Sequence, residues 1–194
     1  SRNVGDKLIE QRTKEILAQE KGATVFETIF REEPLDDRLE EINASRAILM
    51  PAFPVRDTPM HPGTYRLVDD LSRIRVPMIP IGANWNVYPG DAQSRRDVRY
   101  SEQTVAFLRH VAGQVESVSC REYFAGRVLG KHGVHNTVMT GDPAFFDLGS
   151  LGKAMARPAT VERVVFTPPL SPFYAAQAEQ VMRMLAELFA LAER

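Results

Sequence analysis

Short runs of β-forming apolar residues alternate along this chain with longer amphipathic or polar stretches, and this alternation constrains the fold more than any other feature of the sequence. The apolar runs occur at residues 47–50, 76–81, 115–119 and 137–139. Successive parallel strands need a connection long enough to cross the sheet, usually a helix, and the stretches between the runs can supply one. We therefore predict an α/β fold with a largely parallel sheet and helices on both of its faces.

The segments around the apolar runs carry helix signals. Ser101 is a suitable N-cap for a helix with Val105, Leu108 and Val111 on one face, and Asp6 is placed to cap the first helix of the chain. We also expect helices over residues 65–74 and 122–131 and an early strand over residues 23–29. The prolines in the run at 76–81 suit the start or the edge of a strand better than its middle.

The regular pattern breaks between residues 149 and 160, where glycine, arginine and proline become frequent. We assign residues 1–150 to a first domain, 151–160 to a linker and 161–194 to the first strand and helix of a second domain. That strand is expected over residues 161–167 and that helix over residues 173–191. One strand and one helix cannot build a core, so we expect the second domain to be truncated, and the loop-like start of the chain looks trimmed as well.

Composition narrows the classes of protein that this chain can represent. The only cysteine, Cys120, excludes an internal disulfide and is favoured as a buried small side chain over a nucleophile; the four scattered histidines lack zinc-ligand spacing. A formal net charge of -1 gives no reason to expect a nucleic-acid or membrane partner. No apolar run approaches the roughly 20 residues of a transmembrane helix, and the start has no signal-peptide pattern. We expect a cytoplasmic protein without a metal site.

Four short motifs follow one another along the chain and carry a family resemblance. They are Asn3-x-Gly5-Asp6, Tyr100-Ser101, Val118-Ser119-Cys120-Arg121-Glu122 and Thr140-Gly141-Asp142-Pro143-Ala144-Phe145. With this order and spacing the chain resembles the polysaccharide pyruvyl transferase family over most of residues 3–167. It departs from the family at Cys120, where Val or Ile is usual, and in lacking the second half.

The resemblance implies two Rossmann-type domains facing a cleft, as in GT-B glycosyltransferases, of which this chain would hold the first. It implies a transferase that moves pyruvate from phosphoenolpyruvate to sugar hydroxyls as a ketal, in exopolysaccharide or other glycan biosynthesis, with no cofactor. We expect this activity of the complete two-domain enzyme, with phosphoenolpyruvate and a sugar or glycan precursor as its partners. Two alternatives stay open: a GT-B-type glycosyltransferase that uses a nucleotide sugar, and a non-catalytic binding domain of the same fold. Homo-oligomer formation is also left open.

Arg121 is the first candidate for holding the anionic donor, because its planar fork of N–H groups suits a carboxylate or a phosphate. The equally weighted alternative is an ion pair with Glu122, Asp142 or a helix carboxylate that only joins two loops. Asp142, which follows Gly141, can orient Arg121 or position a substrate hydroxyl, although a role in the turn itself is favoured.

Glu122 and His61 complete the catalytic candidates. Glu122 can donate a proton if burial raises its pKa, but a glutamate in the first turn of a helix is equally expected as a partner of the helix dipole. His61 lies in a proline-rich loop and titrates near neutral pH, which suits an acid or base, yet a solvated loop histidine is the more common case.

Two groups are candidates for binding substrate. At the start of the first helix these are Asn3, Gly5 and Asp6, where a phosphate or sugar can meet the helix N-terminus, although capping by Asp6 is the preferred interpretation. After the strand at 76–81 they are Asn84, Trp85 and Asn86, a polar and aromatic group able to stack on a sugar ring. A tryptophan that covers the edge of the core is the favoured alternative there.

Overall fold

The structure, a computed structural model, describes residues 4–22, 25–56, 58–85, 97–154, 156, 159–160 and 175–192. The chain divides into two compact units, Ser1–Gly152 and Lys153–Arg194. The second unit contains one described helix, α6 (Ala175–Ala192), where the sequence predicts a helix over 173–191. The strand predicted over 161–167 lies outside the described residues.

The first unit is built on parallel strands. Strand β1 (Ile48–Pro51) pairs with β3 (Met78–Ile81), β2 (Pro54–Val55) pairs with β4 (Asn84–Trp85), and β5 (Val118–Cys120) pairs with β6 (Thr137–Met139), all in parallel. A bridge between Ala83 and Cys120 connects the β3–β4 segment to β5, so β1, β3, β5 and β6 lie side by side in chain order. This confirms the prediction of an α/β fold with parallel strands. The paired stretches of strand are short, and the described strands neighbour one another in the same order in which they follow along the chain.

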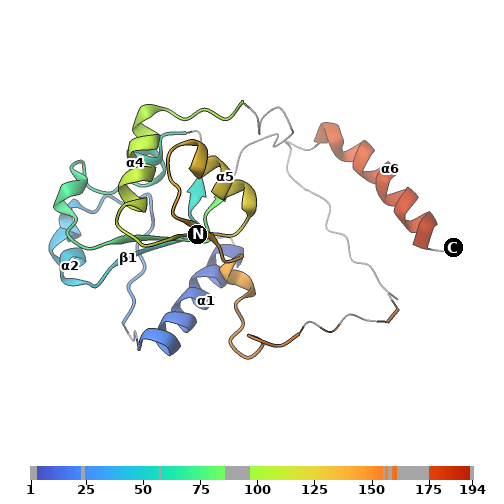
Figure 1. Cartoon of the computed structure of the whole chain (residues 1–194), viewed down its shortest axis with the longest axis horizontal. Coiled ribbons are helices and arrows are strands. Elements are labelled where there is room, and N and C mark those ends of the chain that lie inside the picture. The colour runs from blue at the N-terminus through green and yellow to red at the C-terminus, as the bar shows by residue number, and fades with distance from the viewer. Residues whose placement is uncertain are drawn as a thin grey trace. The chain divides into compact units, whose positions relative to one another are not determined.

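Helices flank the strands on two sides (Figure 1). Helices α4 (Glu102–Ala112) and α5 (Tyr123–Lys131) lie on one side, and α1 (Val4–Lys21) lies on the other. The short helix α2 (Leu39–Ala44) precedes β1. Two of these helices begin where the sequence predicts: the hydroxyl of Ser101 caps α4 by accepting the N–H of Thr104, and α5 starts directly after Glu122. The core between the layers includes Phe53, Val68, Met78, Leu108 and Leu129.

Several local predictions are wrong. Residues 25–30 form no strand, and the exposed side chains of Val25 and Phe30 show that this segment has little to pack against. Residues 65–74 form no α-helix but a single 3₁₀ turn, Leu71–Arg73, because the Asp70 carboxylate accepts the N–H of Ser72 and competes with a helical pattern. Asp6 lies within the first turn of α1 rather than at its N-cap.

Pro80 also differs from the prediction, because it lies inside β3 and is buried. Successive N–H groups of a strand point to opposite neighbours. The register of β1 and β3 and the bond from Met78 N–H to the Gln114 side chain place the missing N–H of position 80 on the side away from β1. On that side, pairing with β5 begins only at Ala83, so the proline costs the sheet no ladder bond.

None of the described helices combines the length and apolar character that crossing a membrane requires.

Candidate functional site

Two neighbouring segments of the backbone, the one from β1 to β2 and the one from β3 to β4, kink together at the point where the candidate site begins. Between β1 and β2 stands Ala52 with φ 52°, and between β3 and β4 stands Gly82 with φ 61°, both in the left-handed region. The register is the same before and after the kink, with Pro51 opposite Ile81 and Pro54 opposite Asn84. A left-handed alanine is strained and persists only where the surrounding structure holds it.

The kink turns polar groups of the backbone toward β5. The N–H groups of both Gly82 and Ala83 bond to Ser119, at 2.9 Å to its Oγ and 2.7 Å to its carbonyl oxygen. In a regular strand these two successive groups would point to opposite sides. The left-handed conformation of Gly82 therefore fixes the end of β5, the position from which Arg121 projects.

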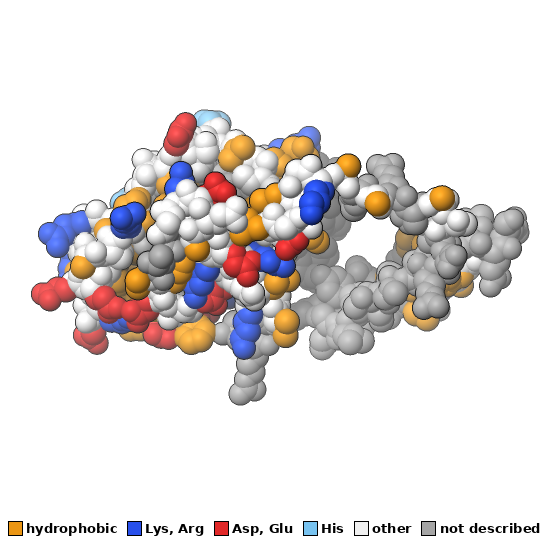
Figure 2. Space-filling model, turned by 90° about the horizontal axis from the view of Figure 1, so that it is seen from below, with side chains coloured by type: hydrophobic (Ala, Val, Ile, Leu, Met, Phe, Trp, Pro, Cys, Tyr) orange, Lys and Arg blue, Asp and Glu red, His pale blue; other side chains and the backbone are white. Residues whose placement is uncertain are grey.

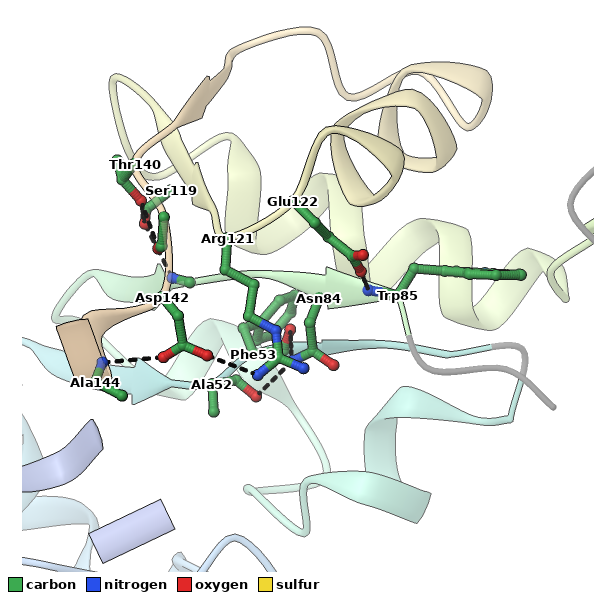
Figure 3. Close-up of polar contacts among 12 residues, drawn as sticks. Ala52, Phe53, Asn84, Trp85, Ser119, Arg121, Glu122, Thr140, Asp142 and Ala144 are labelled. Atoms are coloured by element: carbon green, nitrogen blue, oxygen red, sulfur yellow. Dashed lines mark hydrogen bonds and ion pairs between the residues drawn. The ribbon is translucent and has the colours of Figure 1, made fainter. Parts of the chain in front are cut away.

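Arg121 and Asp142 meet at this edge. Arg121 Nη1 lies 3.1 Å from Asp142 Oδ2, and the side chains are 35% and 21% exposed. The second carboxylate oxygen, Asp142 Oδ1, accepts the N–H of Ala144 at 3.0 Å, so one carboxylate holds both the guanidinium and the turn that follows (Figure 3). The N–H groups of Thr140 and Gly141 both bond to the carbonyl of Cys120, which joins the ends of β5 and β6. Gly141 adopts φ 87° and is suited to this turn.

Two hydroxyl groups lie beside this ion pair. Ser119 Oγ and Thr140 Oγ1 are 2.6 Å apart and come from β5 and from the residue after β6 (Figure 3). Both belong to the motifs quoted above, yet no role was predicted for them. Their position after adjacent parallel strands is the signal that identifies them.

Glu122 and Trp85 form the other flank of the site. A carboxylate oxygen of Glu122 accepts the backbone N–H of Trp85 at 2.6 Å, and the Trp85 ring packs edge-on against Phe124 with centroids 4.5 Å apart. The indole Nε1 is buried and has no hydrogen-bond partner among the described residues. Glu122 therefore ties α5 to β4, and the Trp85 ring covers part of the α5 surface.

Asn84 stabilises the kink and is buried. Its Nδ2 lies 3.2 Å from the Ala52 carbonyl oxygen and 3.3 Å from that of Phe53, and its backbone N–H bonds to the same Phe53 oxygen. The side-chain bond satisfies the Ala52 carbonyl at the kink, and the backbone bond to Phe53 begins the β2–β4 ladder. The Asn84 side chain thus stabilises the kinked backbone at the candidate site and is not itself exposed there.

His61 is half-buried and held by several contacts. Its Nε2 lies 3.0 Å from the Val68 carbonyl oxygen, its ring stacks on Phe107 of α4, and its own carbonyl accepts a bond from Gln103. Within the described part of the chain, none of these contacts joins His61 to Arg121 or Asp142. The interactions position the loop against α4.

Gly5 and Asp6 lie in the exposed first turn of α1. This helix contacts the turn η4 (Pro143–Phe145), which directly follows Asp142, and Arg12 pairs with Asp147 at 3.3 Å. Asn3 and Asn86 lie outside the described residues. The structure thus brings Asn84, Trp85, Arg121, Glu122, Gly141 and Asp142 together at one edge.

Because the formal net charge of the chain is only -1, affinity for an anion has to come from charged groups at the site itself. Acidic and basic side chains are interspersed over the described part of the face seen in Figure 2. Half-exposed Arg121 supplies a guanidinium fixed at one end by Asp142, with no further hydrogen-bond partner for it among the described residues.

Burial, and then the charge of Glu122, raises the pKa of the Cys120 thiol to about 11, so this buried cysteine stays protonated at neutral pH. The described residues include no cluster of three or more metal-binding side chains.

Comparison of the chain with protein-family models, curated proteins and solved structures gives no match.

Proposed function

We propose that this chain is the donor-binding part of a pyruvyl transferase that moves pyruvate from phosphoenolpyruvate to sugar hydroxyls as a ketal. Its fold would be Rossmann-like and form one half of a GT-B-like enzyme. The ion pair with Asp142 is also what an arginine that only joins two loops would form, so one further observation carries the proposal: Asp142 engages a single guanidinium nitrogen, and the partly exposed remainder has no other hydrogen-bond partner among the described residues at the carboxyl ends of β5 and β6. Ligands of open parallel sheets bind at this edge.

The chemistry of the donor fits this arrangement. Phosphoenolpyruvate carries a carboxylate and a phosphate, and its enol carbon has to be protonated before a hydroxyl attacks the neighbouring carbon. A guanidinium that Asp142 holds by one nitrogen keeps its other N–H groups available at the rim for either anion. The Ser119 and Thr140 hydroxyls can extend such a contact. We assign no general acid, because Glu122 and His61 are both held by contacts with the backbone.

The test is calorimetric titration with phosphoenolpyruvate of the unchanged chain and of Arg121→Ala. Loss of a charge-assisted contact is expected to weaken binding by about tenfold or more. Arg127→Ala is the matched control, because Arg127 is an exposed arginine of α5 without a hydrogen bond or ion pair to the other described residues, and its loss removes the same charge. Arg121→Lys tests whether the planar fork is needed.

Equal affinity in all four proteins would remove Arg121 from the donor site. A thermal-shift panel then separates the alternatives. Stabilisation by UDP- or GDP-sugars without stabilisation by phosphoenolpyruvate would favour a nucleotide-sugar glycosyltransferase and overturn the pyruvyl transfer proposal.

A further inference from the structure

A cavity separate from the Arg121 site opens beside the loop that follows β2. Its volume is about 350 Å³, which is near the lower end of the range for small-molecule sites. The lining residues are Arg31, Glu32, Arg56, Thr58, Pro59, Gly63 and Thr64. Two arginines, two threonines and a glycine are the residue types that recur around phosphate groups.

Arg56 is the residue that points to a ligand. It directly follows β2, and its Nε is buried with no hydrogen-bond partner in the described part of the chain. A charged N–H group that has lost water and gained no acceptor is costly. Four other buried atoms in the described part of the first unit share this condition, namely Arg12 Nε, Thr13 Oγ1, Trp85 Nε1 and His132 Nε2, but among these five residues Arg56 alone lines the cavity. A bound oxyanion would supply the acceptor that Arg56 lacks.

The charges of the cavity favour an anion. Arg31 Nε donates to Glu32 Oε1 at 2.9 Å, and this bond lowers the pKa of Glu32, which is therefore ionised at neutral pH. That pair neutralises itself and leaves Arg56 without an opposite charge among the described lining residues. Burial raises the pKa of the Tyr65 phenol, and the charges of Arg31 and Arg56 lower it while that of Glu32 raises it. All three of these charged residues line the same cavity, where the two arginines outnumber the one carboxylate.

Residues 58–64 of the loop beside the cavity are held in place by hydrogen bonds. The Thr64 N–H and Oγ1 both bond to the Pro59 carbonyl oxygen, and the Thr58 carbonyl accepts the Thr104 hydroxyl of α4. The cavity is thus preorganised by the first turn of α4, which lowers the entropic cost of binding.

We propose that this cavity binds the phosphate group of a phosphorylated small molecule, with Arg56 as its principal ligand. Arg56 offers a fork of N–H donors to tetrahedral oxyanions, and Arg31 and the Thr58 hydroxyl extend the contact. The inference is independent of pyruvyl transfer, because it uses neither Arg121 nor Asp142 and holds for any reaction at the other site.

The test follows backbone amide signals of the full chain by NMR during titration with glucose 1-phosphate, inorganic phosphate and glucose. The amides of Gly63 and Thr64 report on the cavity, and that of Gly141 reports on the Arg121 site. We expect saturable shifts at Gly63 and Thr64 with both phosphates and none with glucose. Tighter binding of glucose 1-phosphate than of inorganic phosphate would identify a phosphate ester as the ligand class; the reverse order would identify free phosphate.

Charge-removing variants decide whether Arg56 carries the site. Arg56→Gln is expected to weaken the titration at Gly63 by about tenfold or more, and Arg31→Gln gives a second variant at an exposed position. Arg66→Gln is the matched control, because Arg66 is an exposed arginine outside the lining, and it should leave the affinity within about twofold. Equal weakening in all three variants, or no shift at Gly63 in the unchanged chain, overturns the proposal. Loss of phosphoenolpyruvate binding in Arg121→Ala bears only on the other site.

Discussion

At the scale of single residues, substitutions at two left-handed glycines distinguish the cost of backbone strain from the cost of steric overlap. Gly22 and Gly82 both have φ 61°, but a Cβ at Gly22 would meet nothing within 4 Å, whereas one at Gly82 would lie 2.7 Å from Pro143 Cδ. Gly22→Ala is expected to lower the free energy of unfolding by about 1 kcal/mol. Gly82→Ala adds the overlap with a buried ring and should cost roughly 2 to 4 kcal/mol.

Chemical denaturation of both variants measures this difference. Equal losses would mean that the contact between Gly82 and Pro143 relaxes freely. The kink would then not be held by the turn that carries Asp142.

His132 gives a prediction of pH dependence at the same scale. Its ring stacks on Tyr100, its Nε2 is buried without a partner in the described region, and burial lowers its pKa, with further contributions from Lys131, Arg99 and Arg109. The native state therefore disfavours the imidazolium form. The free energy of unfolding is therefore highest, as far as His132 is concerned, above the ordinary histidine pKa of about 6.5, where the ring is neutral in both states. This stability is lost as the pH falls through the lower pKa of the native state.

His132→Phe keeps the stacked ring but cannot titrate. We expect its melting temperature to fall less than that of the unchanged chain between about pH 7.5 and about pH 5.5. His135→Phe, at an exposed histidine, should keep the original pH dependence. The same drop in all three proteins would assign the acid sensitivity to other groups.

At the scale of elements, the start of α4 joins the helix layer to the loop beside the Arg56 cavity. Ser101 Oγ lies 3.2 Å from the Thr104 N–H and 3.2 Å from Thr104 Oγ1, and Thr104 and Gln103 bond to the carbonyls of Thr58 and His61. The N-cap therefore stabilises more than the helix itself.

Ser101→Ala is expected to lower the free energy of unfolding by about 1 kcal/mol, because it leaves the Thr104 N–H without its cap. Ser101→Asp should retain most of that stability, since aspartate is an equally good N-cap. Urea denaturation measures both. An aspartate variant as unstable as the alanine variant would show that the cap bond is not what the serine contributes.

At the scale of the whole molecule, the main core cluster lies within one unit. Its buried members run from Leu35 to Val134, inside Ser1–Gly152. Removal of residues 153–194 is therefore expected to leave a cooperative unfolding transition with a melting temperature close to that of the full chain. Removal of residues 1–22 instead deletes α1, with buried Ile9 and the Arg12–Asp147 pair, and should lower it.

Differential scanning calorimetry compares the three proteins. Loss of a cooperative transition in the chain that ends at residue 152 would show that the first unit does not fold by itself.

Local sequence signals predicted those elements whose start or extent is marked by their own residues. Ser101 marks the start of α4, and the apolar run at 137–139 coincides with β6. The same reasoning failed at residues 65–74, where four apolar side chains are buried without forming a helix because the surrounding chain covers them. Propensity is a weak guide where tertiary packing supplies the burial.

The chain's α/β class and the approximate places of its main strands followed from the sequence alone, because the alternation of apolar runs and amphipathic segments is typical of parallel strands joined by helices. The pairing of Arg121 with Asp142, the kink shared by Ala52 and Gly82, and the cavity around Arg56 were decided only by the tertiary structure. Each depends on where separate segments meet in space, and residue order along one segment does not fix that distance. Arg56 and Arg121 both directly follow strands, but only the folded chain shows that the Arg121 guanidinium has a carboxylate partner, whereas the buried Arg56 Nε has no hydrogen-bond partner among the residues that the structure describes.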